Sequence, residues 1–201
     1  MMPRRDDINT ILVLGSGPIK IGQAAEFDFS GSQAVRALRE DGYEVILVNS
    51  NPATIQNDPE MADRVYIEPL LPDTVRKILE IEKPDALLAG MGGQTALNIA
   101  SELSHDGTLE KLGVELIGSD LDAIDKAEDR ELFNQVCESI DLPISQAIAC
   151  NSMEEVIKAA EEIGSWPILI RPAFTLGGLG GGTAFDMGQL VEIATLGLRN
   201  S

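Results

Sequence analysis

Histidine, cysteine and long apolar runs are scarce in this sequence, and their scarcity excludes several classes of protein. The single histidine, His105, lies at the expected end of a helix, where a capping or surface role is favoured over catalysis. Cys137 and Cys150 form no CxxC pair and have no histidine nearby, which argues against a metal or redox site. No run of about 18 apolar residues occurs, and the N-terminal MMPRRDD is not followed by the apolar region of a signal peptide. We therefore expect a cytoplasmic protein without a membrane span.

Positive charge is scarce as well. The chain has 15 Lys and Arg against 33 Asp and Glu, which gives a formal net charge of −18. So large an excess of acid opposes binding to nucleic acid or to an anionic membrane, and neither is expected as a partner. A small anionic ligand such as a nucleotide is still compatible with this charge, provided that a few arginines and a bound cation offset the repulsion locally.

Apolar runs and amphipathic segments alternate through the first 120 residues. The runs that predict buried strands are TILVLG, EVILVNSNP, DALLAG and VELIGS. The segments that predict helices between them are SQAVRALRED, DTVRKILEIEK and GGQTALNIASEL. This order predicts an α/β domain of residues 1–120 with a doubly wound, Rossmann-like parallel sheet. Ligands of such sheets bind at the carboxyl ends of the strands, which here carry Gly15, residues 49–51 and residues 90–94.

The pattern changes near residue 120, where we place a domain boundary. Two helical stretches come first, and Ser152 with Glu155 then forms a capping box that predicts the start of a further helix. PILIRP predicts a strand, TLGGLGGG a glycine loop, TAF a returning strand and MGQLVEIATLGL a last helix. A strand and its returning strand do not complete a sheet, so residues 121–201 are interpreted as an incomplete α+β domain and the chain as a fragment.

The glycine turn after the first strand, GSGPIKIG, is similar to a dinucleotide-binding fingerprint. Gly15, Gly17 and Gly22 would let backbone N–H groups approach a phosphate. However, the spacing is not G-x-G-x-x-G, and the next strand ends in Asn-Ser-Asn at residues 49–51 instead of an acidic residue. These departures disfavour a nicotinamide-dependent oxidoreductase, and a tight turn at the sheet edge is the alternative explanation of the glycines.

A second glycine cluster, TLGGLGGG, lies between two extended runs and not before a helix, so it is not a P-loop. A hairpin loop with so few side chains can fold its amides over the phosphates of a nucleotide and open again for exchange. Arg171 stands at the end of the preceding strand, where its guanidinium could make paired hydrogen bonds with phosphate oxygens. The alternative is a surface hairpin in which Arg171 forms a salt bridge.

Six segments, in order and spacing, resemble the large subunits of the carbamoyl phosphate synthetase family. They are GSGPIKIGQAAEFDFSGSQA, ILVNSNPATIQNDPEMAD, YIEP, MGGQTALN, AIDKAEDR and IRPAFTLGGLGGG. The similarity covers essentially all 201 residues. Other ATP-grasp ligases share a glycine loop but not GQAAEFD or MGGQTALN. SGSQA after EFDF resembles the first of the two homologous halves of that subunit.

This resemblance implies an ATP-grasp carbon–nitrogen ligase. Its first half phosphorylates bicarbonate with ATP, ammonia converts the carboxyphosphate to carbamate, and its second half phosphorylates carbamate. Residues 1–120 then match the pre-ATP-grasp domain, and residues 121–201 match the start of the first ATP-grasp domain. The residues that match ATP-binding positions of the family are Arg130, Arg171, Gly177 and Gly178. Leu179 departs from the pattern, because a smaller or polar residue is expected there.

The resemblance also implies cofactors and partners. ATP is a substrate with Mg²⁺ or Mn²⁺, bicarbonate and ammonia are the co-substrates, and a glutaminase small subunit and the remainder of the large subunit are partners. The metal ligands of the family are expected downstream of Ser201, so no catalytic residue and no metal ligand is assigned in this chain, and the fragment alone is expected to be inactive. The alternative is a stand-alone nucleotide-binding or regulatory module without turnover.

Overall fold

The computed structural model of the chain describes residues 4–17, 23–172 and 180–200. The contacts divide the chain into two compact units, Met1–Ile140 and Asp141–Ser201, and each is described by itself. Over the described ranges, no helix combines the length and the apolar character needed to cross a membrane.

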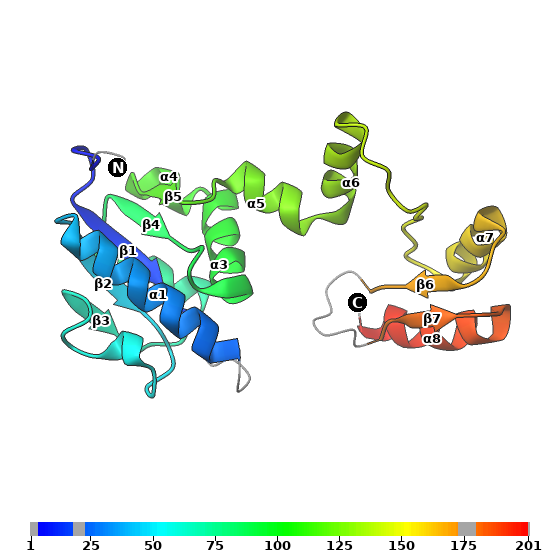
Figure 1. The fold of residues 1–201 in the computed structure, drawn as a ribbon, viewed down its shortest axis with the longest axis horizontal. Coiled ribbons are helices and arrows are strands. Elements are labelled where there is room, and N and C mark those ends of the chain that lie inside the picture. The colour runs from blue at the N-terminus through cyan, green and yellow to red at the C-terminus, as the bar shows by residue number, and fades with distance from the viewer. Residues whose placement is uncertain (1–3, 18–22, 173–179, 201) are drawn as a thin grey trace. The chain divides into compact units, whose positions relative to one another are not determined.

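The first unit is built on a five-stranded parallel sheet (Figure 1). The strands are β1 (Thr10–Leu14), β2 (Glu44–Val48), β3 (Arg64–Tyr66), β4 (Ala86–Leu88) and β5 (Glu115–Ile117). Their order across the sheet is β3-β2-β1-β4-β5, and every neighbouring pair is parallel. The order reverses between β1 and β4, which is the pattern of a doubly wound sheet. The predicted fold class is therefore confirmed for this unit.

Helices cover the two faces of this sheet (Figure 1). They are α1 (Gln23–Glu40) on one face, and α2 (Pro72–Glu82), α3 (Gly93–His105) and the short α4 (Thr108–Leu112) on the other. Alternation along β1 explains the two layers, because Leu12 packs in the cluster that contains α2 and α3, whereas Val13 packs in the cluster that contains Val35 of α1. Both faces of the strand are thus buried, as its continuous apolar run predicts.

Helix α1 begins well before the segment that its apolar pattern predicts. The prediction covered residues 32–41, whereas the helix starts at Gln23. Gly31 interrupts the apolar spacing, and a Cβ there would lie 2.0 Å from Nε2 of Gln56, so the buried Gln56 side chain would have to shift. The glycine in this helix therefore reflects close packing against the loop after β2, which the sequence pattern does not reveal.

Two further helices complete the first unit. Helix α5 (Leu121–Glu128) is capped by Asp120, whose side chain accepts a hydrogen bond from the N–H of Ala123 at 2.8 Å, and α6 (Arg130–Ser139) follows it directly. Because α5 packs against α3 and α6 packs against α5, the contacts assign both helices to the first unit. The domain boundary near residue 120 stays a prediction.

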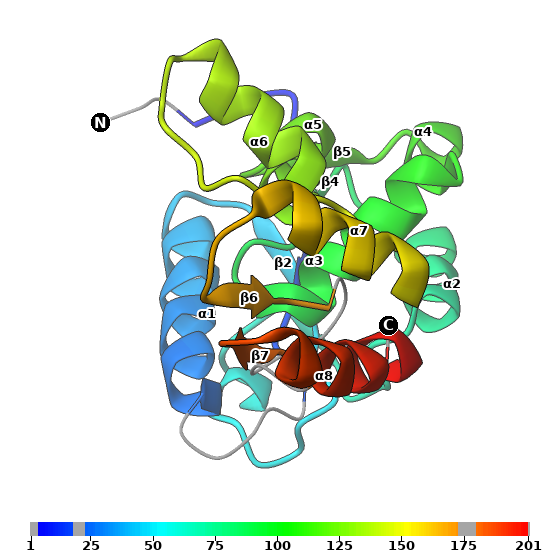
Figure 2. The same cartoon turned by 90° about the vertical axis from the view of Figure 1, so that its right-hand side faces the viewer.

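The second unit is a two-stranded antiparallel hairpin with two helices beside it (Figure 2). Its elements are α7 (Met153–Ile163), β6 (Ile168–Ile170), β7 (Gly182–Ala184) and α8 (Met187–Asn200). A small core of Ala160, Ala184 and Leu190 joins them. Ser152 Oγ accepts a hydrogen bond from the N–H of Glu155 at 3.3 Å, which confirms the predicted cap of α7.

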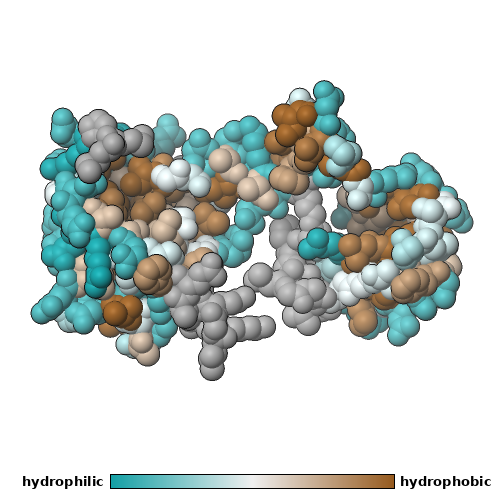
Figure 3. Space-filling view, viewed as in Figure 1, coloured by the Kyte–Doolittle hydropathy of each residue, from teal (hydrophilic) through white to brown (hydrophobic). Residues whose placement is uncertain are grey.

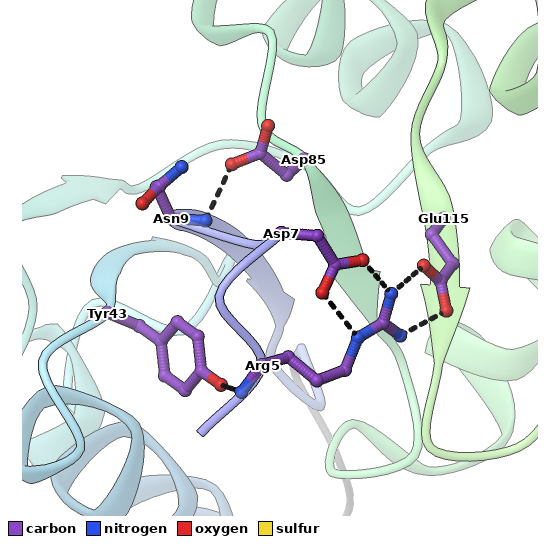
Figure 4. Close-up of polar contacts among 6 residues, drawn as sticks. All are labelled: Arg5, Asp7, Asn9, Tyr43, Asp85 and Glu115. Carbon is purple, nitrogen blue, oxygen red and sulfur yellow. Dashed lines mark hydrogen bonds and ion pairs between the residues drawn. The ribbon is translucent and has the colours of Figure 1, made fainter. Parts of the chain in front are cut away.

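Polar contacts join segments at the amino end of the sheet in the first unit (Figure 4). Asp85 Oδ2 accepts a hydrogen bond from the N–H of Asn9 at 2.8 Å. Arg5 donates to Glu115 through two nitrogens, at 2.6 and 2.8 Å, and also to Asp7. These hydrogen bonds from the guanidinium hold the pKa of the Asp7 and Glu115 carboxyls below their usual values.

Replacing Arg5 by Met is expected to lower the free energy of unfolding at pH 7 and to have less effect in acid. Carboxyl groups whose pKa is lower in the folded state stabilise it above their unfolded pKa of about 4, and this contribution is lost as the pH falls through the folded pKa. Urea unfolding of wild type and R5M between pH 7 and pH 3 measures the difference, with Lys77→Met as a control for the loss of an exposed cation. If R5M lowers the free energy of unfolding by the same amount at every pH, the proposed stabilisation of the two carboxylates by Arg5 is wrong.

Candidate functional site

The carboxyl end of the sheet carries a network of buried amide side chains. Asn49, directly after β2, is fully buried; its Oδ1 accepts a hydrogen bond from the N–H of Gly17 at 3.2 Å, and its Nδ2 donates to Oε1 of Gln56 at 3.0 Å. Gln56 in turn donates from Nε2 to the carbonyl oxygen of Phe27 in α1 at 2.9 Å. The structure therefore joins the turn after β1, the end of β2 and helix α1. Residues 49–51 are expected at this edge from the sequence, whereas Gln56 is not, because its segment has no periodic pattern.

Glycines at this edge permit close approach of protein atoms. A Cβ at Gly15 would lie 2.6 Å from the side chain of Asn49, and a Cβ at Gly92 would lie 2.6 Å from the carbonyl oxygens of Gly15 and Leu14. The edge between β1 and β4, where a dinucleotide would bind in a doubly wound sheet, is thus occupied by the loop before α3. This packing supports the tight-turn interpretation of Gly15, while Gly22 lies outside the described residues.

Four buried oxygens in this region have no hydrogen-bond partner within the described part of the chain. They belong to the side chains of Ser16, Asp28, Ser50 and Asn57. Buried polar atoms are almost always paired with protein or with ordered water. Ordered water or a small ligand could therefore pair with these four oxygens.

Arg130 begins α6 at the corner where α5 ends. The residue between the two helices, Asp129, ends α5 by donating its N–H to the carbonyl oxygen of Asp125 at 2.9 Å. Its Oδ1 then accepts a hydrogen bond from the N–H of Leu132 at 2.9 Å, which caps α6. Helix α6 presents apolar surface to solvent (Figure 3), with Phe133 52% exposed.

Arg171 directly follows β6 in the second unit. Ile168 and Ile170 pack towards the core between the hairpin and its helices, whereas Leu169 is 63% exposed on the opposite face. Because side chains alternate along a strand, position 171 continues the face of Leu169. Arg171 is exposed and stands at the end of the hairpin that leads into the glycine loop. Of the predicted loop residues, Gly177 and Gly178 lie outside the described residues.

The described residues do not fit a metal centre. Within residues 4–17, 23–172 and 180–200, no three His, Cys, Asp or Glu side chains come together as possible metal ligands.

The chain is similar in fold to biotin carboxylase domains. The biotin carboxylase domain of 2-oxoglutarate carboxylase from Hydrogenobacter thermophilus, crystallised with MgADP, ADP and bicarbonate, matches 96% of this chain and 41% of that chain, with a TM-score of 0.70 and 19% identity. At this identity the likeness shows the fold alone.

Sequence comparison shows the family. Residues 7–126 match the carbamoyl phosphate synthase preATP-grasp domain, and residues 129–201 match the carbamoyl-phosphate synthase L chain, ATP binding domain. The chain therefore belongs to the carbamoyl phosphate synthase large-chain family, and the resemblance given by the six sequence segments is confirmed.

Two relatives show how much of a large chain is represented here. The carbamoyl phosphate synthase large chain of Synechocystis sp. (strain ATCC 27184 / PCC 6803 / Kazusa) is 58% identical over 200 residues, which are 100% of this chain and 18% of that protein. The N-terminal section of the large chain of Aquifex aeolicus (strain VF5) is 56% identical over 200 residues, which are 100% of this chain and 36% of that protein. The chain thus spans well under half of the length of either relative.

Proposed function

We propose that this chain is the N-terminal part of a large subunit that makes carbamoyl phosphate from bicarbonate, glutamine-derived ammonia and two ATP, and that it belongs to the half that phosphorylates bicarbonate. The observation that carries the proposal is the match to two consecutive domains of this family, over residues 7–126 and 129–201. In addition, this chain aligns over its whole length with a relative of which it spans only 18%. This alignment disfavours a stand-alone nucleotide-binding or regulatory module.

In the proposed first step, a bicarbonate oxygen attacks the γ-phosphorus of ATP and the bond to the ADP oxygen breaks. Ammonia then attacks the carbonyl carbon of carboxyphosphate, inorganic phosphate leaves with the bridging oxygen, and carbamate is formed. Such phosphoryl transfer depends on groups that neutralise the charge of the phosphate oxygens. In a chain with a formal net charge of −18, nearby arginines are needed to make the site attractive to ATP.

The residues proposed to bind ATP are Arg130, Arg171, Gly177 and Gly178. The position of Arg171 supports this assignment, because it follows the exposed face of β6 at the end of the hairpin that leads into the glycine loop. A guanidinium at this place could donate two parallel hydrogen bonds to phosphate oxygens. The backbone N–H groups of Gly177 and Gly178 would add further donors, since no side chain obstructs their approach.

The remaining assignments follow from the family. We assign residues 1–120 to the pre-ATP-grasp domain and residues 121–201 to the start of the ATP-grasp domain. Mg²⁺ or Mn²⁺ would accompany ATP, and the structurally similar carboxylase domain crystallised with MgADP and bicarbonate supports Mg²⁺. A glutaminase subunit would supply ammonia, and the enzyme would act in the cytoplasm.

ATP hydrolysis with and without bicarbonate tests the proposed function. In the large chain that carries this sequence, ADP release without ammonia is expected to depend on bicarbonate, because bicarbonate is the phosphoryl acceptor. The isolated chain of residues 1–201 is expected to release no ADP. A large chain whose hydrolysis rate is unchanged by bicarbonate would contradict the proposal.

A further inference from the structure

Polar contacts hold helix α5 against helix α3 at two places. Near the end of α3, Asp125 of α5 contacts Nε2 of His105 at 3.1 Å and accepts a hydrogen bond from Oγ of Ser101 at 3.4 Å. Near the start of α3, Gln94 donates from Nε2 to Oε2 of Glu128 at 2.7 Å. The two pairs show that the helices run antiparallel, so the start of α3 holds the end of α5.

Gln94 is itself held in place by its own helix. Its Nε2 also donates to Oδ1 of Asn98, one turn further along α3, at 2.9 Å. An amide nitrogen has two hydrogens, and here both are engaged, one within α3 and one across to Glu128. The donor that contacts Glu128 therefore has a defined direction.

Glu128 lies at the end of α5, two residues before Arg130. Asp129 is the only residue between α5 and α6, and it is bonded into both helices. No flexible segment separates the helices, so a shift of the end of α5 must move the first turn of α6. Whatever holds Glu128 therefore also fixes the backbone at Arg130.

We propose that Gln94 is a positioning residue for ATP binding, which acts through its hydrogen bond to Glu128 by holding the α5–α6 corner and thereby the start of α6 at Arg130. This inference rests on the proposed function, in which Arg130 contacts ATP. Gln94 of MGGQTALN and Glu128 of AIDKAEDR then share one role, although they lie 34 positions apart in the sequence.

A reversal of donor and acceptor tests the inference. Gln94→Glu places a second carboxylate beside Glu128, and like charges at hydrogen-bond distance repel. Glu128→Gln alone keeps an acceptor oxygen for Gln94, so only a small change in the KM for ATP is expected. The double variant Q94E/E128Q restores one donor and one acceptor in the opposite direction. Asn98→Ala is the matched control, because it removes the other partner of Gln94 and leaves the contact to Glu128.

The readout is the KM for ATP and the kcat of bicarbonate-dependent ATP hydrolysis in the large chain that carries this sequence. Q94E is expected to raise the KM for ATP three- to tenfold and to change kcat less than twofold. E128Q, N98A and the double variant are expected to stay within twofold of wild type in KM. If Q94E does not fold, Gln94→Ala serves in its place, with the same expected rise in KM.

The outcomes separate this inference from the function on which it rests. A wild-type chain without bicarbonate-dependent hydrolysis would contradict the proposed function itself, and an unchanged KM in Arg130→Ala would contradict the role of that arginine. In a chain that passes both tests, an unchanged KM in Q94E overturns the positioning role. So does a double variant that recovers the wild-type melting temperature without recovering KM, since the effect of Gln94 on KM would then not pass through its hydrogen bond to Glu128.

Discussion

Replacing Gly92 by Ala is expected to lower the free energy of unfolding by about 3 kcal/mol. The added Cβ would lie 2.6 Å from the carbonyl oxygens of Leu14 and Gly15 and 2.5 Å from Cβ of Ala96. Backbone atoms cannot move aside as the end of a flexible side chain can, so the loop before α3 must shift away from β1. Urea unfolding followed by circular dichroism measures the change.

Gly90 provides the matched control, because it lies in the same loop and a Cβ there would meet no atom within 4 Å. Gly90→Ala is expected to change the free energy of unfolding by less than about 0.5 kcal/mol. Equal stabilities of G92A and G90A would show that the loop does not pack against the end of β1 as described.

Replacing Arg171 by Ala is expected to raise the KM for ATP about 30-fold in the large chain that carries this sequence, which corresponds to about 2 kcal/mol. The proposed reason is the loss of charge-assisted hydrogen bonds to phosphate oxygens. Steady-state ATP hydrolysis in the presence of bicarbonate measures KM and kcat together. Arg171→Lys keeps the charge but loses the paired donors. Its KM for ATP is therefore expected to lie between those of wild type and R171A.

Arg199→Ala controls for the general loss of positive charge, since Arg199 is an exposed arginine in the last turn of α8 in the same unit. Its KM for ATP is expected to stay within twofold of wild type. If R199A and R171A raise KM equally, the effect is one of net charge, and the specific assignment of Arg171 is wrong.

The main elements of the fold could be predicted from the sequence because each carries a local signal. Continuous apolar runs identified β1, β2, β4 and β5, and the capping box at Ser152 identified the start of α7. The start of α1 could not be predicted, since Gly31 breaks the apolar spacing for a reason that lies in Gln56. That glycine faces a residue far along the chain, and no local pattern reports such a contact.

The candidate site was predictable to a smaller extent. The rule that ligands bind at the carboxyl ends of parallel strands predicted that Gly15 and Asn49 lie at one edge of the sheet, and the structure brings them together. The assignments of Arg130 and Arg171 to ATP stay predictions. Long-range pairs such as Gln94 with Glu128 depend on how helices pack, and sequence separation gives no indication of them.

Transfer of oxygen-18 from labelled bicarbonate tests the central claim most directly. The large chain that carries this sequence is mixed with ATP and oxygen-18 bicarbonate without ammonia, and the inorganic phosphate is analysed by mass spectrometry before the label exchanges with water. If bicarbonate is phosphorylated and the carboxyphosphate is then hydrolysed at its carbon, each phosphate molecule keeps the bridging oxygen and carries one labelled atom. Unlabelled phosphate would show that the phosphate gained its new oxygen from water and not from bicarbonate, and would contradict the assignment of this chain to the half that activates bicarbonate.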